Sequence, residues 1–129
     1  MQRLTDLRLS DAEALFAARA FEASYYLAGY AVECALKACI AKRTREFDFP
    51  DRREVERSYT HDLARLVEVA KLKDDLAEAS ASDEALKRYW SIVSNWSEGS
   101  RYALDFDEDA AQNMLIAVTG VLSWVKKRW

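Results

Sequence analysis

The sequence has few of the residues that interrupt helices and few of those that bind metals. Its 129 residues include one proline, three glycines, two cysteines and a single histidine, His61. So few helix breakers predict long helices joined by few turns. With one histidine and no paired thiols, the chain cannot assemble the usual zinc ligand set, and we expect no metal or cofactor.

Other absences exclude whole classes of protein. The sequence has no glycine-rich phosphate loop, no targeting segment with a charged start and an apolar run, and no apolar stretch approaching the roughly 18 residues of a membrane span. We therefore expect a soluble, cytoplasmic protein without a membrane partner. The net charge of −3 provides no basic field across the domain, which argues against strong non-specific binding to nucleic acid but allows a local basic patch.

The stretch that is most distinctive runs from Phe21 to Lys42. Only three residues between Phe21 and Ala41 are charged, and a helix that is apolar nearly all round is a buried one. At 100° per residue one stripe of this helix holds Tyr25, Gly29, Val32, Leu36 and Ile40, and small residues cover the far side at Ala28, Ala31, Ala35 and Ala38. One polar line remains, made of Tyr26, Tyr30, Glu33 and Lys37.

Both cysteines, Cys34 and Cys39, lie on this predicted helix, five positions apart. Helix geometry would separate their α-carbons by about 8.6 Å, too far for a disulfide. We expect two buried, reduced thiols.

The remaining elements follow from caps and periodicity. Ser10 and Glu13 form a capping box for a helix to about Ala20, with Ala14, Leu15, Ala18 and Phe21 facing inward and a kink or short turn near Ala20–Phe21. Thr60 is expected to cap a helix that buries Leu63, Leu66, Val67 and Ala70. A loose connection or frayed helix over Lys73–Ser82 leads to a helix through about Asn95, and acidic residues at Asp105–Glu108 begin a last helix to about Lys127.

Between these helices, Arg43–Tyr59 mixes charges of both signs around Pro50. This composition is typical of a solvated loop, with a short helical turn after Pro50 and with Phe47 and Phe49 holding it to the body. The chain as a whole is predicted to be one all-α domain, residues 1–129, built as an up-and-down antiparallel helical bundle of four long helices plus one or two short ones.

Three segments resemble a known family. The run from Tyr26 to Ala38, YLAGYAVECALKA, closely resembles the signature helix of the HEPN domain family. Thr60–Leu63 is similar to the histidine-led element of that family, and Trp90, Trp96 and Ser100–Tyr102 resemble its tryptophan and arginine–tyrosine stretch. The segments occur in the family's order over roughly residues 10 to 129.

This resemblance implies a helical bundle that pairs as a homodimer and acts on RNA or nucleotides, either as a ribonuclease toxin or as a partner of a small nucleotidyltransferase. Ribonuclease members carry an arginine followed, after four to six residues, by a histidine. Arg101 matches the arginine, but the matching positions hold Phe106, Asp107 and Glu108. Arg57 precedes His61 by three intervening residues and also misses the pattern. We therefore expect weak catalysis or none.

The candidate site residues each have two interpretations. Glu33 and Lys37 are spaced as a helix ion pair, which either ties the helix to a neighbour, for example through Arg101, or forms a polar pocket with Tyr26 and Tyr30; we favour the first. His61 either orders its turn, which we favour, or acts as a base or phosphate ligand. Arg101 beside Tyr102 either holds a phosphate and stacks a base or pairs with Glu33.

Three hypotheses follow. The first is a non-catalytic or weakly catalytic module that dimerises and binds RNA, a nucleotide or a protein partner around Glu33, Lys37, His61, Arg101 and Tyr102. The second is a metal-independent ribonuclease of a toxin–antitoxin pair that uses Arg101 with His61. The third is the helical partner subunit of a small nucleotidyltransferase. The charged residues Arg52, Arg53 and Arg57 are either a phosphate-facing rim or a solvated loop, and we favour the loop.

Overall fold

The computed structural model describes residues 1–46 and 52–129, and every regular element in these residues is a helix. The elements are α1 (Gln2–Ala17), α2 (Phe21–Glu46), α3 (Arg52–Ser58), α4 (Leu63–Val69), α5 (Lys73–Ser82), α6 (Glu84–Val93), the 3₁₀ helix η1 (Glu98–Tyr102) and α7 (Glu108–Val125). The longest are α1, α2 and α7, with 16, 26 and 18 residues. The predicted all-α helical bundle is confirmed.

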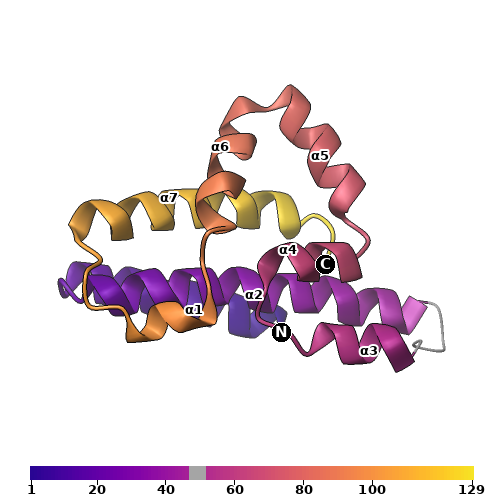
Figure 1. Ribbon diagram of the computed structural model, residues 1–129, viewed down its shortest axis with the longest axis horizontal. Helices are drawn as coiled ribbons and strands as arrows, with labels where there is room; N and C mark the ends of the chain where they lie inside the picture. The colour runs from indigo at the N-terminus through magenta and orange to yellow at the C-terminus, as the bar shows by residue number, and fades with distance from the viewer. Residues whose placement is uncertain (47–51) are drawn as a thin grey trace.

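Helix α2 forms the centre of the bundle, where α1, α4, α7 and η1 all pack against it (Figure 1). The hydrophobic residues of α2 with no exposed surface are Ala28, Ala31, Val32, Ala35 and Leu36. The prediction of a buried central helix is therefore confirmed. Its alanines explain the close packing, because a methyl side chain lets a neighbouring helix axis approach.

The three longest helices differ in their relative directions. Helix α1 runs antiparallel to α2, whereas α2 and α7 run the same way (Figure 1). Contacts at both ends of this pair show the shared direction: Tyr25 stacks on Phe106 near the two helix starts, with ring centroids 3.9 Å apart, and the Cys39 Sγ lies 3.9 Å from the Val125 carbonyl oxygen near the two ends. Helices α2 and α7 match in direction as the second and fourth helices of an up-and-down bundle do, and the chain between them forms the shorter helices α3 to α6 and η1.

The shorter helices close the core on one side. Leu63 and Leu66 of α4 are buried against α2, together with Val67 and Ala70, as predicted. Residues 73–82 form the helix α5, which buries only Leu76. Together α5 and α6 rise from the body as an arch over α4 and α7 (Figure 1).

The start of the first helix was predicted wrongly. Helix α1 begins at Gln2, so Ser10 lies inside it and is exposed instead of capping it. The residues before Ser10 contain no helix breaker, and the Thr5 hydroxyl donates to the Met1 carbonyl oxygen within the first turn. The buried residues of α1 are Thr5 and Ala12, whereas Ala14 and Ala18, expected inside, are exposed.

The turn expected near Ala20–Phe21 is present. Helix α1 ends at Ala17 and α2 begins at Phe21, and Arg19 between them has a φ of 63°. The Arg19 and Ala20 N–H groups donate to the carbonyl oxygens of Phe16 and Leu15, which closes the end of α1.

Two further predictions need correction. Asp62, not Thr60, caps α4, because its carboxylate accepts from the Arg65 N–H at 3.2 Å. The stretch predicted as a charged loop is mostly helical where it is described, since α2 continues to Glu46 and α3 covers Arg52–Ser58. The helical turn expected after Pro50 corresponds to α3, while Phe47, Phe49 and Pro50 lie outside the described residues.

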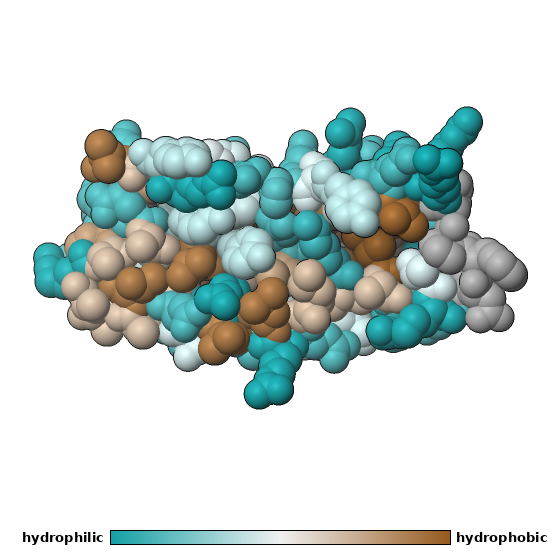
Figure 2. Space-filling model, turned by 90° about the horizontal axis from the view of Figure 1, so that it is seen from below, coloured by the Kyte–Doolittle hydropathy of each residue, from teal (hydrophilic) through white to brown (hydrophobic). Residues whose placement is uncertain are grey.

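No helix within residues 1–46 or 52–129 combines the length and apolar composition that crossing a lipid bilayer requires. Seen from below, hydrophobic side chains reach the surface at several places along the molecule, separated by hydrophilic ones (Figure 2).

Candidate functional site

The polar line of α2 lies where the sequence predicts it. Glu33 is buried, with only 2% of its side chain exposed, and its Oε1 accepts from the Lys37 Nζ at 2.8 Å. One turn earlier, the rings of Tyr26 and Tyr30 stack with centroids 6.2 Å apart. A buried carboxylate is costly unless it is paired, so the partners of Glu33 decide whether this line is stable.

The second partner of Glu33 is His61, which comes from the connection between α3 and α4. The His61 Nδ1 lies 2.9 Å from Oε1 and 3.1 Å from Oε2 of Glu33. Because an ionised carboxylate only accepts hydrogen bonds, Nδ1 must carry the proton and donate it. His61 therefore connects segments 28 residues apart, whereas the favoured prediction was a local role in ordering its own turn.

Glu98 extends these contacts to η1. Its Oε2 lies 3.3 Å from the His61 Nε2, and its Oε1 lies 3.2 Å from the Arg101 Nη2. Arg101 thus pairs with Glu98 and not, as one interpretation had it, with Glu33. The result is a continuous charged row, Lys37–Glu33–His61–Glu98–Arg101.

Sequence reasoning missed Glu98. The available signal was its spacing of three residues from Arg101, which suits an ion pair on one turn of helix.

Trp96 fixes this part of the chain against α2. Its indole N–H donates to the Tyr26 carbonyl oxygen at 3.1 Å, and its ring stacks on that of Tyr26 with centroids 5.9 Å apart. The ring also covers Gly29, where an added Cβ would lie 2.2 Å from Trp96 Cδ1. Because Trp96 is two residues before η1, this packing holds Glu98 and Arg101 beside the α2 line.

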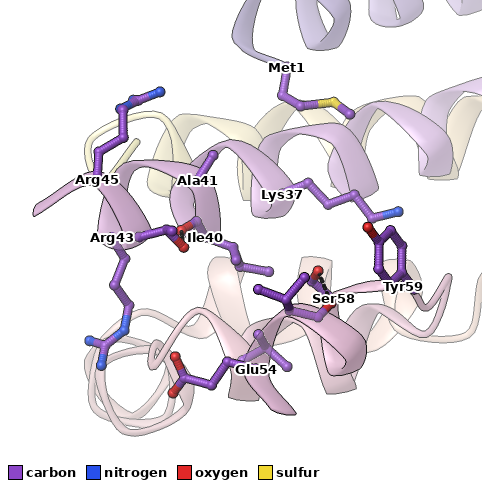
Figure 3. A pocket seen from close by; sticks show the side chains of 12 residues that line it. Met1, Lys37, Ile40, Ala41, Arg43, Arg45, Glu54, Ser58 and Tyr59 are labelled. Atoms are coloured by element: carbon purple, nitrogen blue, oxygen red, sulfur yellow. Dashed lines mark hydrogen bonds between the residues drawn. The ribbon is translucent and has the colours of Figure 1, made fainter. Parts of the chain in front are cut away.

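Two exposed aromatic rings border the charged row. Tyr59 and Tyr102 expose 81% and 74% of their surface. The Arg101 guanidinium carbon lies 4.9 Å from the centroid of the Tyr102 ring. At the other end of the row, the Lys37 side chain extends toward Tyr59 at the edge of a cavity between α2 and α3 (Figure 3).

A cavity of about 510 Å³ opens beside the middle of the row. It lies between the connection that leads into α4 and the segment that leads into η1, and it is lined by Tyr59, Thr60, His61, Asp62, Ser94, Trp96, Ser97, Glu98 and Gly99. This volume is in the range of small-ligand pockets. Within the described residues, no three His, Cys, Asp or Glu side chains are arranged as a metal site requires.

The groups beside Glu33 remain neutral. Burial raises the pKa of the Tyr30 hydroxyl, and the nearby Cys34 and Glu33 raise it further. Burial also raises the pKa of the Cys34 thiol, and Glu33 adds to the effect. Both cysteines are free and buried, as predicted, so neither has the exposed thiolate of a nucleophile.

The positions where the ribonuclease pattern would have a histidine are occupied by side chains with structural contacts. Phe106 stacks on Tyr25, and Asp107 caps α7 by accepting from the Ala110 N–H at 2.9 Å. Glu108 lies in the first turn of α7 and is 3.8 Å from Arg19. On α3, Arg52 pairs with Glu56 at 3.3 Å, and the side chains of Arg53 and Arg57 are exposed.

Comparison with known proteins gives one finding. A family model described as HEPN domain matches residues 6–129, nearly the whole chain. No curated protein and no solved structure gives a significant match.

Proposed function

The chain belongs to the HEPN domain family, whose members are helical modules of nucleotide-binding or ribonuclease type that often dimerise, and from this premise we propose that it is an RNA-binding module that acts as a homodimer. RNA binds along the charged row, with Lys37, His61 and Arg101 toward its phosphates and Tyr59 and Tyr102 toward its bases. The module binds RNA without cleaving it.

The observation that carries this proposal is the pairing of cationic groups with exposed rings. Arg101 lies over the Tyr102 ring, and both are accessible to solvent. Single-stranded RNA is bound in this way elsewhere, by aromatic rings that stack on bases and by cations that contact the phosphates. The acidic balance of the whole chain confines binding to this local patch.

The absence of cleavage is supported by the residues at positions 106–108. A histidine at any of these positions would replace a residue that stacks on Tyr25, caps α7 or pairs with Arg19. General acid–base catalysis needs a titratable group within hydrogen-bond reach of the reacting oxygen, and the family pattern supplies none here.

Binding is tested by fluorescence anisotropy with a labelled single-stranded RNA of about 12 nucleotides. We expect Arg101→Ala and Tyr102→Ala each to weaken binding about tenfold, since stacking of one base contributes roughly 1–3 kcal/mol. Arg57→Ala is the matched control, because it removes the same charge from exposed α3 and should change affinity little. No binding by the unmodified protein, or equal binding by Arg101→Ala, would reject the proposal.

A metal-independent ribonuclease is the second candidate, and one observation favours it: His61 and Arg101 contact the two oxygens of the same carboxylate. The fold thus brings together an arginine and a histidine that are 40 positions apart in the sequence. If this candidate is correct, purified protein cleaves RNA in the presence of EDTA, and Arg101→Ala and His61→Ala each abolish cleavage. Intact RNA after prolonged incubation at high protein concentration would exclude it.

Association with a small nucleotidyltransferase remains a proposal for the protein partner. Co-purification with such an enzyme, together with loss of RNA binding in the complex, would place the charged row at that interface.

A further inference from the structure

The Glu98 carboxylate lies between two groups that bind anions. One oxygen contacts the Arg101 guanidinium and the other contacts the His61 ring, at 3.2 and 3.3 Å. His61 also donates from Nδ1 to Glu33, which leaves Nε2 as the ring nitrogen that faces Glu98. An anion with two oxygens, one near an arginine guanidinium and the other near an imidazole from a separate segment, has an arrangement in which proteins also hold a phosphate group.

The two carboxylates that contact His61 differ in burial. Glu33 is 2% exposed, whereas the side chains of Glu98 and Arg101 are 39% and 44% exposed. Exposed ion pairs contribute little to stability, because water and dissolved ions compete for both partners. Glu98 can therefore leave His61 and Arg101 without disturbing the buried pair of Glu33 and Lys37.

The neighbouring cavity provides the space that an exchange needs. His61, Glu98 and Gly99 form part of its wall, and its volume is about 510 Å³. Asp62 is the other acidic residue of the lining, but its carboxylate is engaged in capping α4. Glu98 is thus the negative charge that an incoming phosphate has to replace.

We propose that His61 and Arg101 form a phosphate subsite and that Glu98 occupies it in the free protein as an intramolecular substitute for phosphate. A phosphate group of RNA or of a nucleotide displaces the carboxylate and takes over both contacts. Glu98 thereby lowers the affinity of the free protein for phosphate and favours ligands with additional contacts, such as bases stacked on Tyr102. This inference rests on the proposed function only for the identity of the natural ligand.

The test uses His61 as its own reporter, because it is the only histidine in the chain. Inorganic phosphate is titrated into the full chain at constant pH and ionic strength while NMR follows the His61 ring signals. We expect Glu98→Gln to bind phosphate about tenfold more tightly than the unmodified protein. Glu78→Gln is the matched control, because it removes one negative charge from an exposed position on α5 and should leave phosphate affinity unchanged.

A second variant keeps the test independent of effects on folding. Combining Glu98→Gln with Arg101→Met should abolish the gain, while thermal unfolding shows that the variants remain folded. Phosphate affinity that is unchanged or lower in Glu98→Gln, or absent in all variants, would overturn the proposal, because Glu98 would then only order its two partners.

The same proteins are then titrated with adenosine monophosphate and with labelled single-stranded RNA. Tighter RNA binding by Glu98→Gln supports RNA as the source of the phosphate, and tighter binding of the nucleotide alone supports a free nucleotide. If inorganic phosphate binds Glu98→Gln more tightly but RNA binds no variant, the subsite stands and the proposed RNA-binding function fails.

Discussion

Glu33 and Glu98 both contact His61, yet they should contribute very differently to stability. Breaking a buried ion pair costs about 3–5 kcal/mol, but Lys37 and His61 can reach water when Glu33 is neutralised, which reduces this cost. We expect Glu33→Gln to lower the free energy of unfolding by about 1–3 kcal/mol. Glu98→Gln, at an exposed pair, should change it by less than about 0.5 kcal/mol. Urea denaturation measures both, and equal effects would contradict the role assigned to burial.

Gly29 is required by the close approach of Trp96. An added Cβ would lie 2.2 Å from the Trp96 ring, and that ring is buried and held by its hydrogen bond to Tyr26. Gly29→Ala should therefore destabilise the protein by about 1–3 kcal/mol, even though alanine favours helix more than glycine does. At Gly99 the nearest atom to an added Cβ is 3.5 Å away, so Gly99→Ala should leave the melting temperature nearly unchanged. A neutral Gly29→Ala would show that Trp96 can move.

Cys39 should make stability fall in alkaline solution. Burial raises the pKa of its thiol to about 11. The unfolded thiol ionises near pH 8.5, so the unfolded state loses its proton first as the pH rises. The contribution of the protonated Cys39 thiol to the free energy of unfolding is therefore complete below about pH 8.5 and is lost by about pH 11. Between pH 7.5 and 10, unfolding free energy should fall about 1–2 kcal/mol more in the unmodified protein than in Cys39→Ala. Parallel pH profiles would contradict this.

At the level of elements, the start of α7 depends on one side chain. Asp107 is the N-cap residue, and its carboxylate accepts from the Ala110 N–H at 2.9 Å. Asp107→Ala should cost about 1 kcal/mol, the usual effect of removing an N-cap. Asp105→Ala removes the same charge two positions earlier, where the side chain is exposed, and should cost less than about 0.5 kcal/mol. Equal losses in thermal unfolding would mean that charge near the helix dipole matters more than the cap.

The elements that sequence patterns predict well are those with local causes. The apolar residues of α2 and the inward-facing residues of α4 can be recognised from periodicity, and the structure buries both sets. The helix start predicted from the capping box at Ser10 was wrong. Such a motif marks the start of a helix only if the residues before it are not helical, and Gln2–Leu9 are helical.

The candidate site was predictable in its parts but not in its connections. The i, i+4 spacing of Glu33 and Lys37 indicates their ion pair. The contact between Glu33 and His61 joins α2 to a connection 28 residues later, and Glu98 enters through η1, which no periodicity indicated. Such contacts depend on how the helices pack together, which a local pattern does not specify.

For the whole molecule, the distribution of apolar side chains supports the proposed homodimer. Leu7, Leu104 and Ile116 are half or more exposed, and hydrophobic groups reach the surface at several places (Figure 2). Ile116 borders a shallow hollow that α1, α6 and α7 share, lined also by Glu13, Tyr89, Leu115, Thr119 and Gly120. Exposed apolar residues beside a hollow are more typical of an interface than of a surface that stays in water.

A homodimer would cover such a surface, and the chain exposes enough area for a stable interface. A stable interface takes about 800 Å² from each partner, which is about a tenth of the 7767 Å² that the described chain exposes. Light scattering at micromolar concentration should therefore give about twice the 14.8 kDa of one chain. Ile116→Lys should shift the mass toward the monomer, because a charge at the centre of an interface is costly to desolvate, whereas Lys127→Ala on the exposed end of the chain should not. A monomer at all concentrations would contradict the dimer, and a dimer that tolerates Ile116→Lys would place the interface on another face.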